Sequence, residues 1–179
     1  GIVVFGKLLR GIDGTAAELG HLTVHRDGRK CGCGSLGCLE AYASVTGMLR
    51  TAAEGWDAAD TSLKAETGND PSKLTGKMIH AAAAAGDAYA RFVFDETATW
   101  IGIGAASMVN ALNPERIVLC GGMIAAGDML FDTVRRVVRE NAFEVPAKRC
   151  QIPAAGLGGD SGVIGCAGCA LARYEDERG

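Results

Sequence analysis

Aromatic residues are scarce in this sequence and make up only 6% of its 179 residues. Because large rings are few and glycines number 26, we expect an interior of Ala, Val, Leu and Ile side chains joined by tight glycine turns. The 48% hydrophobic content is sufficient for a sizeable core in a chain of one-domain length. The composition therefore argues against disorder and favours a single compact α/β domain.

An excess of positive charge is also missing. The chain has 18 Lys and Arg against 21 Asp and Glu, a net charge of −3. Nucleic-acid-binding domains usually gather basic residues on one face, whereas here Lys and Arg are scattered. No nucleic-acid partner is expected.

Long apolar runs are absent too. No run reaches the roughly 18 residues that cross a bilayer, and no charged-then-apolar leader opens the chain. We therefore expect a cytoplasmic protein without a membrane partner. The chain starts with a strand-like stretch, GIVVF, and no initiating Met, which suggests a piece of a longer protein.

Cysteine is the residue whose placement is most informative. Cys31, Cys33 and Cys38 fall within eight positions, and His21 precedes the first by ten. Three thiolates and one imidazole complete the tetrahedral coordination that structural zinc prefers, and intervening glycines allow the tight turns that such a loop needs. The sequence predicts a Zn²⁺ site here. Three buried free thiols and disulfide bonds are the alternatives, and the odd total of seven cysteines argues against a disulfide scaffold.

The other four cysteines are not expected to join this site. Cys120 ends one predicted strand and Cys150 begins another. Cys166 and Cys169 have redox spacing, but they lie inside a predicted apolar helix, where buried cysteine behaves as a small hydrophobe.

Two carboxylates flank the cysteine loop in the sequence. Glu18 stands three residues before His21, and Glu40 follows Cys38 by two. A zinc-bound imidazole keeps one ring N–H to donate, and neighbouring carboxylates accept hydrogen bonds from vicinal hydroxyls. The bland alternative is equally consistent with the spacing: Glu40 would complement a helix N-terminus, and Glu18 would be a solvated surface charge.

Hydrophobic periodicity predicts a mixed order of strands and helices. Thr75 and Asp87 are expected to cap two of the helices. The polar stretch 55–76 is expected to be a surface excursion, and His25 and His80 to be residues without special partners. The predicted strands are 2–5, 8–10, 22–25, 117–120 and 150–154, with a turn at Gly6-Lys7; the predicted helices are 39–53, 77–85, 87–112, 128–140 and a closing helix capped by Asp160 or Ser161.

Two glycine turns are candidate nucleotide contacts. Gly121-Gly122 follows a predicted strand, and the segment 156–160 precedes a helix, so both could offer backbone N–H groups to phosphate. Each signal alone is weak, since neither is a Walker loop or a dinucleotide fingerprint.

Taken together, these residues resemble the ROK family of sugar kinases and related repressors, and within it the actinobacterial glucokinases most closely. The resemblance extends over essentially the whole chain and rests on three stretches: AELGH with CGCGSLGCLEAYAS, NPERIVLCGGMI, and LGGDSGVIGCAGCALA. It implies an actin-like, ribonuclease H-like ATPase fold, of which residues 1–179 would be the large C-terminal domain. It further implies ATP-dependent phosphorylation of a hexose, with glucose as the expected substrate, Mg²⁺ as a cofactor and assembly into a dimer or tetramer.

The resemblance also assigns roles to individual residues. Glu18, His21 and Glu40 would bind sugar hydroxyls, His21 would ligate zinc beside Cys31, Cys33 and Cys38, and Gly121 and Gly122 would lie against the nucleoside. The family's first phosphate loop and its catalytic Asp would precede Gly1, so the 179 residues alone are expected to be inactive. Left open are the identity of the hexose, polyphosphate as the donor, a sugar-responsive transcriptional repressor, and a zinc-stabilised scaffold without a ligand.

Overall fold

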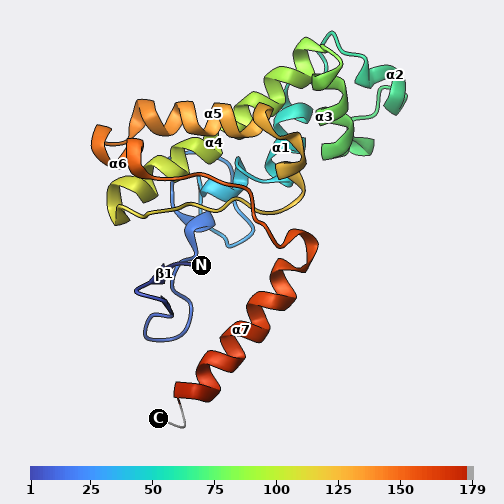
Figure 1. Cartoon of the computed structure of the whole chain (residues 1–179). Coiled ribbons are helices and arrows are strands. Elements are labelled where there is room, and N and C mark those ends of the chain that lie inside the picture. The colour runs from blue at the N-terminus through green and yellow to red at the C-terminus, as the bar shows by residue number, and fades with distance from the viewer. Residues whose placement is uncertain (177–179) are drawn as a thin grey trace.

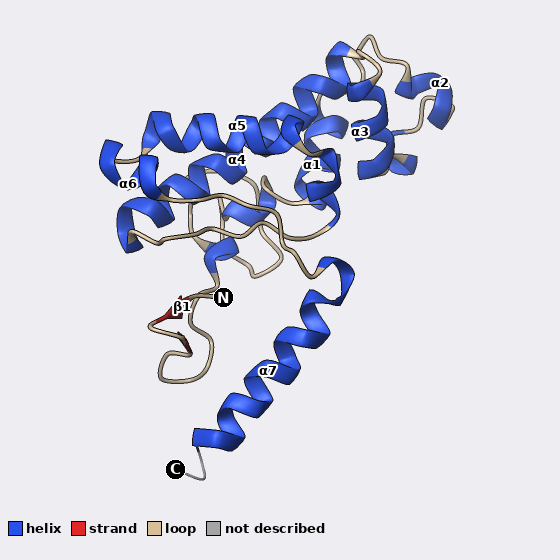
Figure 2. Ribbon diagram, viewed as in Figure 1, coloured by secondary structure: helices blue, strands red, loops and turns tan. Residues whose placement is uncertain are grey.

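Two long helices form the centre of the molecule. A computed structural model describes residues 1–176, and in it α4 (Ala88–Leu112) and α5 (Asp128–Asn141) pack along each other (Figure 1). Helices and loops account for most of the described chain (Figure 2). The other elements are β1 (Val3–Val4), β2 (Lys7–Leu8), η1 (Leu19–His21), η2 (Leu39–Ala41), α1 (Val45–Glu54), α2 (Leu63–Thr67), η3 (Pro71–Lys73), α3 (Gly76–Ala84), η4 (Gly122–Ala126), α6 (Glu144–Arg149), η5 (Gly158–Asp160) and α7 (Ser161–Asp176).

Helix α4 begins and ends where the sequence predicts. The Asp87 carboxylate accepts a hydrogen bond from the Ala90 N–H at 2.9 Å, which caps the helix, and Asn113 closes it in the left-handed conformation. Its small residues allow close packing: a Cβ placed on Gly102 would lie 2.6 Å from Cβ of Val137 on α5. The predicted cap at Thr75 is also confirmed, because its hydroxyl accepts from the Met78 N–H.

The amphipathic pattern over 128–140 is confirmed by α5. Its apolar residues, at helical spacing, are almost fully buried, while its arginines reach solvent. The buried set is Leu130, Phe131, Val134, Val137 and Val138. The predicted helix over 39–53 begins later than expected, because Ser44 caps α1 by accepting from the Gly47 N–H; residues 39–41 form the separate turn η2.

The stretch 55–76 is not the surface excursion that its polarity suggests. It contains α2 and η3, and several of its side chains belong to the core, including Trp56 at 4%, Leu63 at 0% and Leu74 at 5% exposure. Asp87 fastens this segment to α4 by accepting hydrogen bonds from the Thr61 hydroxyl and the Ser62 N–H. The polar residues therefore form the outer face of a folded segment whose apolar side chains belong to the core.

The predicted strands 117–120 and 150–154 run side by side in parallel. The Ile117 N–H donates to the Gln151 carbonyl and the Leu119 N–H to the Pro153 carbonyl. The pairing consists of two isolated bridges, since Pro153 has no N–H to donate. Residues 22–25 likewise do not form a strand and make a single bridge, Thr23 with Cys38.

The hairpin β1–β2 and helix α7 extend from the body in the same direction (Figure 1). The turn residues are Phe5 and Gly6 rather than Gly6-Lys7, since Val4 pairs with Lys7 and both turn residues have positive φ. The expected buried strand is wrong, because Val3 is 67% exposed. Within residues 1–176, no helix is long and apolar enough to cross a membrane.

Candidate functional site

The structure brings the four predicted metal ligands together. The sulfurs of Cys31, Cys33 and Cys38 and a ring nitrogen of His21 all lie within 4.8 Å of one another. His21 Nδ1 is 3.7 Å from Cys31 Sγ, and the Cys33 and Cys38 sulfurs are 3.6 Å apart. With Zn–S near 2.3 Å and Zn–N near 2.0 Å, tetrahedral edges would measure about 3.8 Å between sulfurs and about 3.6 Å between sulfur and nitrogen. The donor set and its spacing therefore fit a zinc ion.

Backbone hydrogen bonds hold the cysteine loop in this shape. The Cys31 N–H donates to the Ser35 carbonyl at 2.9 Å, and the Gly37 N–H donates to the Arg29 carbonyl at 2.8 Å. Gly37 has φ +70°, and a Cβ there would lie 1.6 Å from the His25 carbonyl oxygen. No other residue fits that position without rearrangement of the loop.

The thiols differ in acidity when no cation is present. Hydrogen bonds from the backbone and side chain of Ser35 lower the pKa of Cys33 to about 6. Burial raises the pKa of Cys38 to about 12. Three thiolates this close would repel one another, so a dication is what would allow all of them to ionise.

Arg29 anchors the loop to α1, and sequence reasoning missed it. Its side chain is 11% exposed, and its guanidinium pairs with Glu54 and donates to Thr51 Oγ1 and to the carbonyls of Ala41 and Gly47. It also lies over the Tyr42 ring, 4.8 Å from the centroid. The sequence does not distinguish Arg29 from Arg26 in the same loop, because the partners of Arg29 come from η2 and α1 further along the chain.

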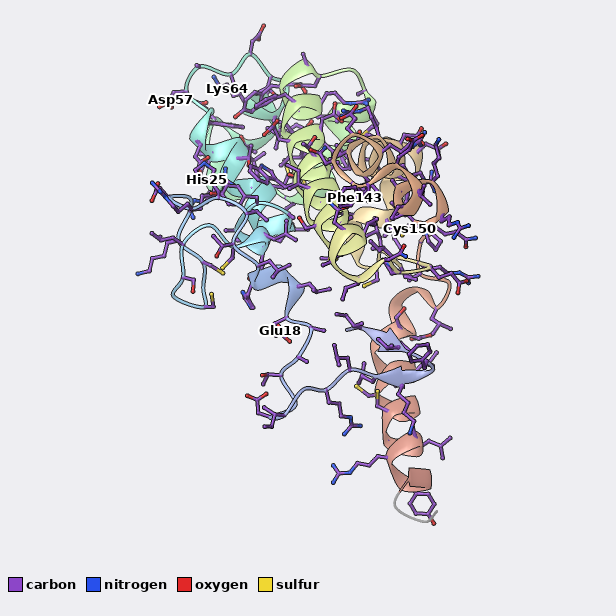
Figure 3. The ribbon with its side chains drawn as sticks, turned by 90° about the vertical axis from the view of Figure 1, so that its left-hand side faces the viewer. Glu18, His25, Asp57, Lys64, Phe143 and Cys150 are labelled. Atoms are coloured by element: carbon purple, nitrogen blue, oxygen red, sulfur yellow. The ribbon has the colours of Figure 1, made fainter. Side chains whose placement is uncertain are left out.

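Glu40 reaches the Glu-x-Gly-His element of residues 18–21. A Cβ on Gly20 would lie 3.7 Å from Glu40 Oε2, so the carboxylate lies directly against this turn. Glu18 precedes η1, and its carbonyl accepts from the His21 N–H at 3.0 Å. Figure 3 shows Glu18 on the segment that joins the hairpin to the body. His21 turns Nδ1 to the sulfurs, which leaves Nε2 available to another partner.

One cavity joins the predicted sugar and nucleotide elements. It has a volume of about 420 Å³, and Gly20 and Glu40 line it together with Gly121 and Gly122. Glu18 and His21 are not among its lining residues. Gly121 has φ +95°, which favours glycine, and a Cβ on either glycine would meet nothing within 4 Å. The second glycine segment, 156–160, lies elsewhere, at the start of α7.

The cavity's apolar wall includes one face of α4 and the segment 117–119, together with side chains from η2, α1, η4 and α5. Ile101, Ala105 and Met108 are spaced four and three residues apart, so they fall on one face of α4. Helical periodicity alone does not identify this face, because α4 carries apolar residues on several sides.

The remaining cysteines and histidines stay apart from the metal cluster. Cys120, Cys150, Cys166 and Cys169 are free thiols. The expectation that Cys166 is buried is wrong, because α7 projects from the body and Cys166 is exposed. The two other histidines are not without partners: His25 stacks on the Tyr42 ring with 6.2 Å between centroids, and His80 contacts Phe94.

Comparison with known proteins confirms the family that the sequence motifs resemble. The model of the ROK family matches residues 1–173. A glucokinase from Halalkalibacterium halodurans is 42% identical over 166 residues, which are 92% of this chain and 50% of that protein. The chain spans about half the length of the curated relatives it matches.

Solved structures resemble the chain closely. A ROK family glucokinase from Streptomyces griseus in complex with glucose and AMPPNP superposes with a TM-score of 0.80 at 34% identity, covering 96% of this chain and 56% of that one. A ROK family transcriptional regulator, a homologue of the E. coli MLC protein, superposes with a TM-score of 0.75 at 30% identity, covering 86% and 38%. The fold is therefore the ROK family sugar kinase fold, related to actin-like ATPases.

Proposed function

The chain belongs to the ROK family, and from that membership we propose that it is the large C-terminal domain of an ATP-dependent hexose kinase acting on glucose. The observation that carries the proposal is the cavity shared by Glu40, Gly20 and the Gly121-Gly122 turn. A carboxylate and a glycine turn that open to the same space can hold an acceptor hydroxyl and a nucleotide side by side. The S. griseus glucokinase complex with glucose and AMPPNP supports both ligand assignments.

In this proposal Glu18, His21 and Glu40 hold the sugar. The carboxylates accept hydrogen bonds from ring hydroxyls, and His21 donates from Nε2 while Nδ1 faces the sulfurs. The three side chains fix the sugar so that its 6-hydroxyl is in line with the γ-phosphate. Their contribution is positioning. Gly121 and Gly122 offer an unobstructed backbone surface to the nucleoside of ATP.

Zinc would be held by His21, Cys31, Cys33 and Cys38. When bound, it supplies a fixed orientation and no reagent, because four protein ligands leave no coordination position for water or substrate. Among the described residues that line the cavity, Glu40 is the only carboxylate, so we assign no Mg²⁺ ligand and no catalytic base here. The proposal places both outside the 179 residues, and this chain alone is expected not to turn over ATP with glucose.

Ligand binding tests the proposal directly. Glucose should raise the thermal unfolding midpoint of the zinc-loaded protein, and Glu40→Gln should abolish the shift. Glu66→Gln is the matched control, because Glu66 is an exposed residue of α2, away from the cavity, and its substitution should leave the shift intact. Glucose protection that survives Glu40→Gln would contradict the assignment of the sugar site.

A second function has specific support, since the transcriptional regulator superposes over 86% of the chain. A sugar-responsive repressor would use the same sugar and metal elements without phosphoryl transfer. Formation of glucose 6-phosphate by the complete protein, followed in a coupled assay, decides between the two. Glucose binding without any product would favour the repressor.

A further inference from the structure

A second cleft lies on the other side of α4 from the cysteine loop. In Figure 3, Cys150 and His25 appear on opposite sides of α4, and Cys150 is one of the residues that line this cleft. Its walls are α5, α6 and the segment 150–153, and its volume is about 500 Å³, within the range of small-molecule sites. None of its residues contributes to the cavity of Glu40 and Gly121.

The charged side chains that line this cleft are all cationic. Among the described residues, Arg135, Arg139 and Lys148 line it, and no carboxylate does. Nearby acids compensate part of this charge: Asp132 is 3.5 Å from Arg135, and Glu144 pairs with Lys148. The Glu144 pair is exposed on both sides, and such pairs contribute little and exchange readily for a better anion.

Arg135 and Arg139 are held differently, and the difference favours an anion. Arg135 is fixed in place, because its guanidinium donates to the Ile152 carbonyl at 3.2 Å and lies over the Phe131 ring. Arg139, one turn later, donates only from Nε, to the Arg135 carbonyl. Among the described residues, Arg139 has no acidic partner, so both of its terminal amino groups remain to bind a ligand oxygen pair.

The floor of the cleft is apolar. Val138, Ala147 and Ile152 are buried there at 1%, 9% and 6% exposure, and Pro153 extends the surface. Burial raises the pKa of the Cys150 thiol, so this group stays neutral at physiological pH and does not repel an anion. A ligand for this cleft combines a strong negative charge at one end with an apolar or ring portion at the other.

We propose that this cleft binds a small organic phosphate, with its phosphate on Arg139 and Arg135 and its carbon portion on Val138, Ala147 and Ile152. The site is separate from the proposed kinase cavity. The two are nonetheless joined by paired backbone, since the Ile117 N–H, on the cavity side, donates to the Gln151 carbonyl, on the cleft side. A phosphorylated metabolite bound here would lie one strand away from the substrate cavity.

Titration of ¹⁵N-labelled protein with phenyl phosphate tests the site, because this probe carries both a phosphate and a ring. Saturable amide shifts are expected within residues 135–153, with weaker binding of inorganic phosphate and none of phenol. Arg139→Gln should weaken phenyl phosphate by about tenfold or more, the loss expected for one charge-assisted hydrogen-bond pair.

Arg136→Gln is the matched control, since Arg136 is on the same helix but pairs with Glu140 and does not line the cleft. It should change affinity by less than about twofold. Equal losses in the two variants would overturn the proposal, as would shifts confined to residues 120–124, which belong to the other cavity. Thermal unfolding of each variant confirms that it is folded. Lys148→Gln is a second test of the site, because Lys148 also lines the cleft and its loss should weaken phenyl phosphate binding.

Discussion

Replacing Arg29 by Met should loosen the metal loop from α1 while keeping most of the side-chain volume. The guanidinium donates to two backbone carbonyls at 3.1 Å, to Thr51 Oγ1 at 2.9 Å and to Glu54 Oε1 at 3.1 Å. Hydrogen bonds involving a charged group contribute roughly 1.5–3 kcal/mol each, but desolvation of the cation offsets part of this sum. Because Glu54 is 52% exposed, its ion pair is discounted for solvent screening.

The expected cost is about 3 kcal/mol of unfolding free energy, below the upper range for breaking a fully buried pair. In a chain of this size, that corresponds to a decrease of about 6–12 °C in the unfolding midpoint. Urea unfolding followed by circular dichroism measures the free energy, and competition with a chromophoric chelator measures zinc affinity, which should fall as well.

Arg50→Met provides the control, because Arg50 also pairs with Glu54 and donates to the Lys30 carbonyl at 3.3 Å, but its side chain is 46% exposed. Its loss should cost less than about 1 kcal/mol. If Arg29→Met is no more destabilising than Arg50→Met, the part-buried hydrogen bonds from Arg29 to the Ala41 and Gly47 carbonyls are not what fastens the loop.

Three further predictions concern the loop and one helix cap. Gly37→Ala should abolish the thiolate-to-metal charge-transfer band of the cobalt-substituted protein, because its Cβ would overlap the His25 carbonyl; Gly32→Ala, where space is open, should retain the band. Cys33→Ser should weaken zinc and glucose binding together, and a zinc-free variant that still binds glucose normally would contradict the orienting role. Asp87 has a pKa of about 2, since hydrogen bonds from Ala90, Ser62 and Thr61 outweigh the upward effect of burial. Because its pKa is lower in the folded state, the Asp87 carboxylate contributes about 1–2 kcal/mol of unfolding free energy after allowance for solvent screening. This contribution is present above about pH 4 and is lost as the pH falls toward 2. Asp87→Asn should therefore reduce the dependence of the unfolding free energy on pH between about 4 and 2.

Local signals predicted the parts of the fold that local chemistry determines. The caps at Thr75 and Asp87 and the buried face of α5 follow from residues within a few positions of each other. The cluster of four candidate metal ligands was predicted for the same reason, since three of the four lie in one short loop and their chemistry is distinctive. These features need no knowledge of the rest of the chain.

Tertiary partners determine what the sequence did not reveal. The hairpin turn is displaced by one residue because Phe5 adopts φ 50°, which a sequence pattern does not anticipate for an aromatic residue. In the stretch 55–76, Trp56 and Leu63 are buried in the hydrophobic core cluster, although their polar neighbours suggest a loop. Arg29 finds its acceptors on η2 and α1, and Glu40 and Gly121 line one cavity only once the chain has folded.

Three consecutive residues connect the candidate metal cluster to the cavity. Cys38 is a buried member of the ligand cluster, Leu39 is 7% exposed and Glu40 lines the cavity. Leu39 packs into the space left by Gly104 of α4, where an added Cβ would lie 2.4 Å from Leu39 Cδ2. Because these residues share one short turn, a movement of Cys38 would shift Leu39 from its packing site beside Gly104 and move Glu40 with it. A metal at the cluster would therefore act on the proposed sugar site through rigid covalent geometry, without any contact of its own with the sugar.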